Sequence, residues 1–363
     1  MPTNGAKGSA RSRWLRYAAM GYGAVVVVIT VGLIYVIATD TVRITPDKGR
    51  ADGVAEQRDP DTRAILEDMR GAVPIDGNDP DAAEIEAPAP PSELEDAAPQ
   101  ADQPPPWRRF QAFWDGGDRP RVAVVIDDLG LSTRAARRLA RMPGPYTLAF
   151  LPYADGLPDQ TEKLAAAGHE LMVHLPMQPK SAAVNPGPHV LRMGQSGADF
   201  DRDLRWNLSR FEGFAGVNNH MGSLLTENRG RMDRLMAALK RRGVYFLDSR
   251  TTPESRALDS ADSLHVPAAT RDVFLDNRKD AAYIRGQLAK AEAIAAEHGQ
   301  AIAIGHPYPV TLKVLNAWRD GLSDRGFVLV PLSQVIHHRM ETRRSDLVNG
   351  SNGANGARRV PGR

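Results

Sequence analysis

The sequence predicts an α/β fold in which repeated strand and helix units build a mostly parallel sheet. Three observations predict it: short apolar runs recur between residues 122 and 332, helical periodicity separates most of them, and polar residues follow them. The runs are VAVVI, YTLAFL, ELMVHL, FAGVNN, VYFLD, DVFLD, AIAIG and FVLVPL. This alternation is typical of parallel sheets. Seven or eight units favour a barrel, and no GxGxxG follows the first run, although an open sheet remains possible.

Helical periodicity appears between most of the apolar runs. The clearest stretches are 132–142, 159–168, 231–243 and 281–299. Ser132 precedes the first of them, where its hydroxyl can accept a hydrogen bond from a free backbone N–H of the first turn. These stretches are the predicted helices that connect parallel strands.

The N-terminal residues predict a membrane anchor. Tyr17 to Ala38 contains no charged residue, and its 22 residues would span roughly 33 Å as a helix. Asp40 follows this stretch and four basic residues precede it, namely Lys7, Arg11, Arg13 and Arg16. The positive-inside rule therefore predicts a single-pass inner-membrane protein with residues 1–16 in the cytoplasm and the remainder in the periplasm. A cleaved signal peptide is the alternative, but its apolar region would be shorter.

Composition divides the rest of the chain. Residues 39–106 are rich in Pro, Ala, Asp and Glu, which predicts a disordered linker, and residues 341–363 predict a disordered tail. The folded unit is therefore predicted at 107–340. A formal charge of +2 gives no support for nucleic-acid binding. The absence of cysteine is compatible with an extracytoplasmic domain.

Polar residues lie where the predicted strands end. Because the carboxyl ends of parallel strands share one rim, these side chains are expected to form one site. Any one of them alone has a structural explanation, such as an aspartate that caps the next helix. The strand-end residues are Asp127, Asp128, His174, Asn218, Asn219, His220, Asp248, Arg250, Asp276 and His306.

The adjacent residues Asp127 and Asp128 indicate a bound cation. Neighbouring carboxylates repel, and a cation on one of them lets the other stay ionised as a base. Since adjacent strand residues face opposite ways, the pair is expected in the turn after the strand. Two histidines and one carboxylate suit a divalent metal, zinc or a harder ion in its place. A serine hydrolase is disfavoured because no GxSxG occurs.

Six motifs in order resemble the divergent polysaccharide deacetylase family between Arg121 and Ser333. They are VAVVIDDLG, LAFLPYA, GHELMVHLPMQP, GVNNHMGS, FLDSRT and AIGHPYP. The resemblance implies a deformed (β/α) barrel and a metal-dependent hydrolase that removes acetyl groups from a polysaccharide or cell-envelope glycan. It also implies Asp127 as general base, Asp128 as metal ligand and His306 as the acid that protonates the leaving group.

The chain departs from the main branch of that family at the second metal histidine. The main branch takes both histidines from one H-x-x-x-H stretch, whereas His220 has Gly216 and Leu224 four residues to either side. The second imidazole must come from elsewhere or be missing, and His174 is the nearest candidate in chain order. The Arg-Pro-Tyr substrate motif is also absent. A non-catalytic glycan-binding or scaffold protein without metal therefore stays open as the alternative.

Several other polar and aromatic residues each have two alternative interpretations. Asp248 and Arg250 either orient the base and the ligands or form a structural ion pair. Asn218 and Asn219 either bind a sugar hydroxyl or hold the turn, and Tyr153 either stacks on a sugar ring or packs in the core. His169 lies roughly 16 Å from His174 along an extended strand, so it cannot share an ion with it.

Overall fold

The computed structural model describes residues 103–112, 117 and 119–342. The predicted membrane span and nearly all of the predicted linker and tail lie outside these ranges, so they stay predictions. Within the described ranges, no helix combines the length and the apolar character needed to cross a membrane.

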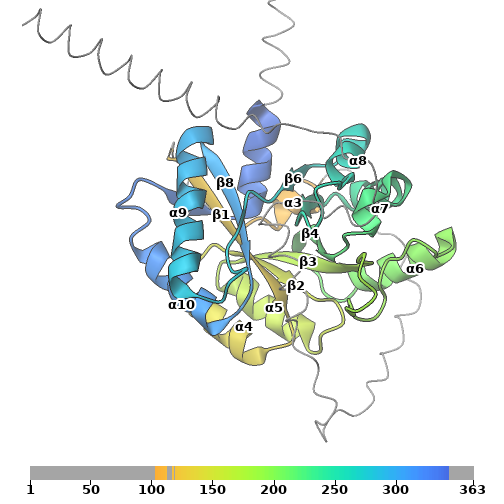
Figure 1. Ribbon diagram of the computed structural model, residues 1–363, viewed down its shortest axis with the longest axis horizontal. Helices are drawn as coiled ribbons and strands as arrows, with labels where there is room; N and C mark the ends of the chain where they lie inside the picture. The colour runs from red at the N-terminus through yellow and green to blue at the C-terminus, as the bar shows by residue number, and fades with distance from the viewer. Residues whose placement is uncertain (1–102, 113–116, 118, 343–363) are drawn as a thin grey trace, which may run out of the picture. The chain divides into compact units, whose positions relative to one another are not determined.

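A nine-stranded sheet forms the centre of the domain (Figure 1). Its order is β6-β5-β4-β3-β2-β1-β8-β7, β9 also pairs with β1, and every pairing is parallel. Each predicted apolar run contains a strand. The bounds are β1 Arg121–Leu129, β2 Thr147–Phe150, β3 Glu170–Met177, β4 Phe214–Met221, β5 Tyr245–Asp248, β6 Ala268–Thr270, β7 Val273–Phe274, β8 Gln300–Gly305 and β9 Val328–Val330.

The sheet is curled, because its two edge strands are consecutive in the chain. Only Arg271 and Asp272 separate β6 from β7. The Arg271 N–H donates to Asp248 O in β5 (3.1 Å), and the Asp272 N–H donates to Ile302 O in β8 (2.9 Å). The predicted α/β fold with parallel strands is confirmed, in the form of a curled half-barrel.

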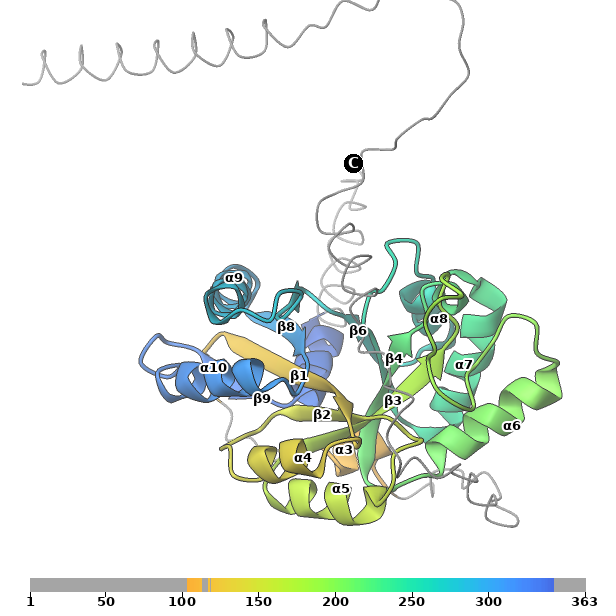
Figure 2. The same cartoon turned by 60° about the horizontal axis from the view of Figure 1, so that its bottom comes forward.

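Helices cover the outer face of the curled sheet (Figures 1 and 2). As predicted, Ser132 caps α4, since its hydroxyl accepts from the Ala135 N–H at 3.2 Å. Residues 332–342 are also helical. The bounds are α3 Pro106–Arg109, α4 Thr133–Leu139, α5 Leu157–Ala166, α6 Gly197–Leu208, η1 Leu225–Glu227, α7 Arg229–Arg242, α8 Ala257–Leu264, α9 Ala281–His298 and α10 Pro309–Asp320.

Alternate residues of each strand face two separate apolar clusters. In β1, Val122 and Val124 pack outward beneath the helices, while Ala123 and Val125 pack inside the curl. Trp107 of α3 belongs to the inner cluster, together with side chains from residues 332–336. The inner cluster fills the amino-terminal part of the curl, so the inward positions left over lie at the carboxyl ends of the strands.

Candidate metal centre and active site

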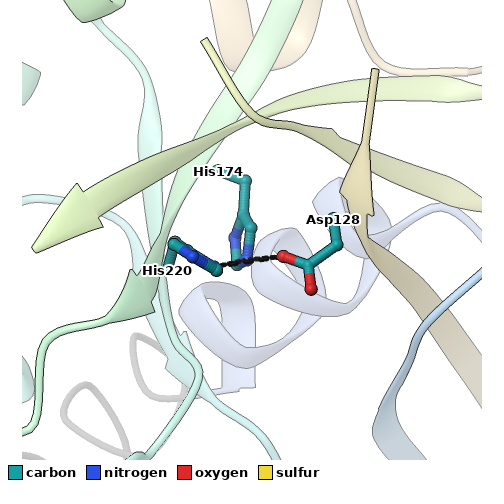
Figure 3. A group of neighbouring side chains, drawn as sticks. All are labelled: Asp128, His174 and His220. Carbon is teal, nitrogen blue, oxygen red and sulfur yellow. Dashed lines mark hydrogen bonds and ion pairs between the residues drawn. The ribbon is translucent and has the colours of Figure 1, made fainter. Parts of the chain in front are cut away.

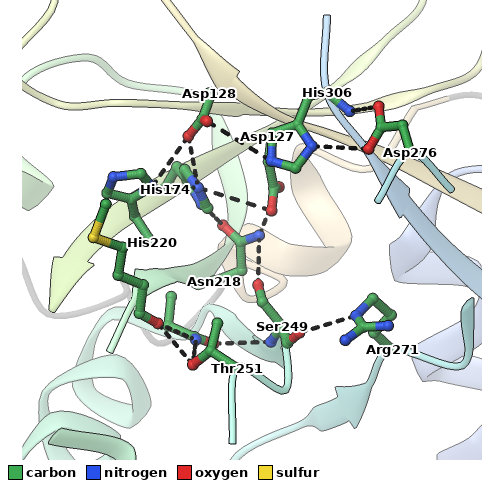
Figure 4. A network of polar contacts seen from close by, with 12 residues as sticks. Asp127, Asp128, His174, Asn218, His220, Ser249, Thr251, Arg271, Asp276 and His306 are labelled. Atoms are coloured by element: carbon green, nitrogen blue, oxygen red, sulfur yellow. Dashed lines mark hydrogen bonds and ion pairs between the residues drawn. The ribbon is translucent and has the colours of Figure 1, made fainter. Parts of the chain in front are cut away.

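The inward positions at the carboxyl ends of the strands are polar (Figure 4). In β8, the inward series Ile302 and Ile304 continues to His306, and in β1 the inward series continues to Asp127. The same alternation brings His174 from β3, Asn218 and His220 from β4, and Ser249 after β5 to this rim. The site therefore consists of inward-facing residues at the carboxyl ends of several strands.

Asp127 and Asp128 both reach the candidate site because β1 is irregular at its end. Pairing with β2 shifts register between Ile126 and Leu129, and Asp128 has φ +55°. Aspartate enters this left-handed region more readily than most residues, and a bulge re-aims side chains. The prediction that the pair lies in a turn after the strand is wrong, because both residues belong to β1. The bulge interrupts the alternation of side chains along β1, so two adjacent residues can face the same site without a turn.

Three ligand atoms converge at the rim (Figure 3). Asp128 Oδ1 lies 3.2 Å from His174 Nε2 and 3.1 Å from His220 Nδ1, and the two nitrogens lie 3.1 Å apart. Asp128 Oδ1 is buried, and no described group donates a hydrogen bond to it with good geometry. Ligands at about 2.0–2.1 Å from a tetrahedral zinc ion lie roughly 3.3 Å apart. The spacing, the donor set and the orphaned oxygen therefore fit a divalent cation.

Asn218 orients two members of the site. Its Oδ1 lies 2.8 Å from His174 Nδ1, and because an amide oxygen only accepts, Nδ1 carries a hydrogen and Nε2 is the ring nitrogen available to a cation. The amide nitrogen donates to Asp127 Oδ1 at 2.8 Å and to Ser249 Oγ at 3.2 Å. One side chain thus fixes the tautomer of a candidate ligand and the position of the candidate base.

The two aspartates titrate differently. Burial raises the pKa of Asp127, and the charges of His174 and His306 offset this only in part. Burial also acts upward on Asp128, but His220 and His174 outweigh it and hold the pKa of Asp128 well below its usual range. Asp128 is therefore the aspartate that stays ionised, and Asp127 is the aspartate that takes up a proton more readily.

His306 is held by Asp276, a fully buried residue after β7. Asp276 Oδ2 accepts from the His306 backbone N–H at 2.7 Å and from Thr311 Oγ1 at 2.8 Å, and Oδ1 lies 3.0 Å from His306 Nδ1. His306 Nε2 then faces the pocket, 3.7 Å from Asp128 Oδ2. Burial lowers the pKa of His306, but Asp276, Asp128 and Asp127 outweigh it and raise the pKa to about 9. A protonated histidine at neutral pH can act as a general acid.

Asn219 and the Asp248–Arg250 pair lie outside this cluster. Asn219 donates to Met221 O (2.8 Å) and accepts from the Ser249 N–H (2.8 Å), so it holds the turn after β4. Asp248 Oδ1 accepts from the backbone N–H of Arg250 at 2.8 Å, and their described side chains form no ion pair. The contact between Asp248 and Arg250 is therefore neither the predicted ion pair nor the predicted contact that orients the base and the ligands.

Tyr153 lies close enough to the candidate site for the charge of Asp128 to act on it. It is half-buried, and a Cβ added to Gly187 would lie 2.4 Å from its ring, so the ring packs tightly on that glycine. Burial, and then the charge of Asp128, raise the pKa of Tyr153 to about 12. It is therefore a neutral phenol at the edge of the site.

His169 lies away from the cluster, as the strand length predicts. Its Nδ1 accepts from the Tyr146 N–H at 3.2 Å and its Nε2 donates to Leu139 O at 3.0 Å. Both ring nitrogens are occupied by backbone groups, so His169 is structural.

Sequence reasoning missed Arg271 and Ser249. Arg271 lies between β6 and β7, and its guanidinium donates to Ser249 O (2.9 Å) and Arg250 O (3.3 Å). Burial and the like charge of Arg250 lower the pKa of Arg271 to about 10, while Asp127 acts in the opposite direction. The sequence carries little signal for Arg271, because the strands beside it have only three and two residues.

The fold and the site together define a parallel α/β half-barrel with a candidate metal centre, a buried aspartate and a histidine–aspartate pair at one rim. Residues 124–336 match the family described as divergent polysaccharide deacetylase, and the chain belongs to that family. The resemblance of the six motifs is thus confirmed.

Three similar proteins extend this result. The chain is 36% identical over 195 residues to the uncharacterized protein YibQ of Escherichia coli K12, a match that covers 54% of this chain and 61% of YibQ. It is 35% identical over 197 residues to an uncharacterized protein of Haemophilus influenzae, covering 54% of this chain and 70% of that protein. The crystal structure of the uncharacterized protein ATU2773 from Agrobacterium tumefaciens C58 superimposes with a TM-score of 0.63 at 26% identity, over 65% of this chain and 97% of that one.

Proposed function

We propose that this protein is a metal-dependent hydrolase that removes acetyl groups from a polysaccharide or cell-envelope glycan. The observation that carries the proposal is the triangle of Asp128 Oδ1, His174 Nε2 and His220 Nδ1, with edges of 3.1 to 3.2 Å. Asp127 Oδ2 lies 3.8 Å from His174 Nε2, so a candidate base stands next to the candidate ligands. Membership of the family supports an acetylated glycan as the substrate.

The residues have separate tasks in this reaction. A divalent ion, zinc or a harder metal, would polarise the acetyl carbonyl and activate the attacking water. Asp127 accepts the proton of that water while Asn218 holds its other oxygen. His306 donates a proton from Nε2 to the leaving nitrogen or oxygen, and Asp276 keeps the ring oriented and charged.

The alternative of a metal-free scaffold depends on the missing H-x-x-x-H pair. His174 stands on β3 beside β4, and Asn218, two residues before His220, pairs with it across the two strands. This neighbouring position on β3 supports His174 as the second imidazole of the proposed metal site. Metal content still distinguishes the two functions.

The proposed location is the inner membrane with the catalytic domain in the periplasm. Its support is the uncharged stretch Tyr17 to Ala38 with basic residues before it. A periplasmic domain would have direct access to envelope glycans.

The direct test measures acetate release by the purified full chain loaded with zinc. N-acetylated chitotetraose and O-acetylated oligogalacturonate serve as substrates for N-acetyl and O-acetyl groups. Asp127→Asn should lose turnover and retain zinc, because it removes a proton acceptor and leaves the ligand set intact. Arg137→Gln, an exposed change on α4, is the control. Zinc-loaded wild type that releases acetate from neither substrate would contradict the proposal.

A further inference from the structure

Four cations gather on one sector of the rim, between the end of β5 and the start of α9. Arg250, Arg278 and Lys279 are exposed and Arg271 is half-buried. Among the described residues, none of the four forms an ion pair with a carboxylate, although Asp272 next to Arg271 pairs with Arg339. We call these four residues the cationic rim.

Arg271 links this rim to the candidate acid. Its guanidinium donates to the carbonyls of Ser249 and Arg250, so its charge is solvated by dipoles and is not neutralised. The guanidinium carbon lies 4.9 Å from the centre of the Phe274 ring, and that ring lies 5.4 Å from the His306 ring. Arg271 is thus one aromatic ring away from His306.

Lys279 is also separated from His306 by one aromatic ring. Its Nζ lies 4.1 Å from the centre of the Tyr308 ring, which lies 5.4 Å from the His306 ring. Arg278, the residue before it, lies with its guanidinium carbon 5.5 Å from the Tyr283 ring. Arg271 and Lys279 are therefore each one aromatic ring away from His306, and aromatic faces hold three of the four cations in place.

Clustered like charges disfavour one another unless an anion joins them. Burial is the main cause that lowers the pKa of Arg271 to about 10, and the like charge of Arg250 adds to it. The two nearby aspartates have other partners: Asp276 pairs with His306, and Asp280 accepts a hydrogen bond from the Tyr283 N–H as the N-cap of α9. A bound anionic group would complete this sector, since cation-lined sites attract anions.

We propose that the cationic rim binds a carboxylate or phosphate group of the substrate, which makes the substrate an acidic glycan. This inference rests on the proposed deacetylation and names its substrate class. Because the rim flanks His306, the anionic group belongs to the part that leaves with the protonated atom: the sugar, not the acetyl group. The acetyl carbonyl would then lie at the candidate metal ligands Asp128, His174 and His220.

The test measures binding directly, on the zinc-loaded full chain, at low salt and at high salt. The probes are tetragalacturonate for carboxylates, N-acetylglucosamine 6-phosphate for phosphates, and chitotetraose as the neutral control. The triple variant Arg250→Gln, Arg278→Gln, Lys279→Gln removes the exposed charges, and Arg137→Gln is the matched control away from the rim. Each exposed contact contributes roughly a two- to fivefold effect on affinity, so the triple variant should bind an acidic probe about 8- to 125-fold more weakly.

The outcomes separate this inference from the proposed function. It is supported if an acidic probe binds at least tenfold more tightly than chitotetraose, if high salt weakens this binding, and if only the triple variant loses it. Which acidic probe binds identifies the carboxylate or the phosphate as the source. Equal binding of all three probes, or a triple variant that binds like wild type, overturns the inference even if acetate is released. Selective anion binding without acetate release from any acetylated substrate would refute the hydrolase and leave the cationic rim in place.

Discussion

Replacement of Asn218 by alanine tests whether the site is organised around a cation. The change removes the acceptor 2.8 Å from His174 Nδ1 and the donor 2.8 Å from Asp127 Oδ1. Loss of a partner that orients a ligating histidine weakens metal affinity by roughly 10- to 100-fold. Each buried group left without a partner costs about 1–3 kcal/mol, so the free energy of unfolding should fall as well.

The neighbouring variant Asn219→Ala is the matched control. Asn219 is also a buried asparagine with hydrogen bonds to the chain, to Met221 O and from the Ser249 N–H, but it holds a turn and touches no candidate ligand. Both variants should lose stability, and only Asn218→Ala should lose zinc affinity, measured by competition with a chelator of known affinity. Wild-type zinc affinity in a folded Asn218→Ala protein would refute the reasoning.

Three further predictions concern acid stability, the candidate acid and membrane topology. Burial lowers the pKa of His169 below its usual 6.5, so below about pH 6.5 the unfolded chain binds this proton more readily than the folded chain, and the free energy of unfolding should fall. Urea unfolding between pH 7.5 and 5 should show a smaller fall for His169→Gln than for wild type. Equal falls in the two proteins would contradict this prediction. Asp276→Asn should lower the pKa of His306 from about 9 and move the alkaline limit of kcat to lower pH, because only the protonated ring can donate a proton to the leaving group. An unchanged alkaline limit would contradict the role of His306 as the general acid. A reporter fused after Arg363 should be active in the periplasm, and activity confined to the cytoplasm would contradict the predicted orientation.

The fold was predictable because its strands are buried on both faces. Runs such as VAVVI remain apolar at every position, and the structure packs Val122 and Ala123 into different clusters on the two sides of β1. The same parallel arrangement brings all strand ends to one rim, which is why His174 and His306 could be placed together from sequence. β6 was missed because Ala268–Thr270 is too short to give a periodic pattern.

The details of the site depend on backbone irregularity and on loops. The bulge that turns Asp128 into the pocket has no sequence signature beyond an aspartate able to adopt positive φ. Arg271 directly follows β6, a strand of only three residues, and its partners are backbone carbonyls, which no residue pattern reveals. Asp248 and Arg250 were paired by charge alone, whereas the contact that forms uses the backbone N–H of Arg250.

Metal content of the purified full chain tests the central claim most directly. After dialysis against zinc, elemental analysis should find about one equivalent in wild type and in His169→Ala, and much less in His174→Ala, because only His174 Nε2 lies beside Asp128 and His220. Circular dichroism of each variant confirms that the domain is folded. Full occupancy in folded His174→Ala would contradict the ligand set, and a wild type that binds no metal would contradict the account and favour the scaffold.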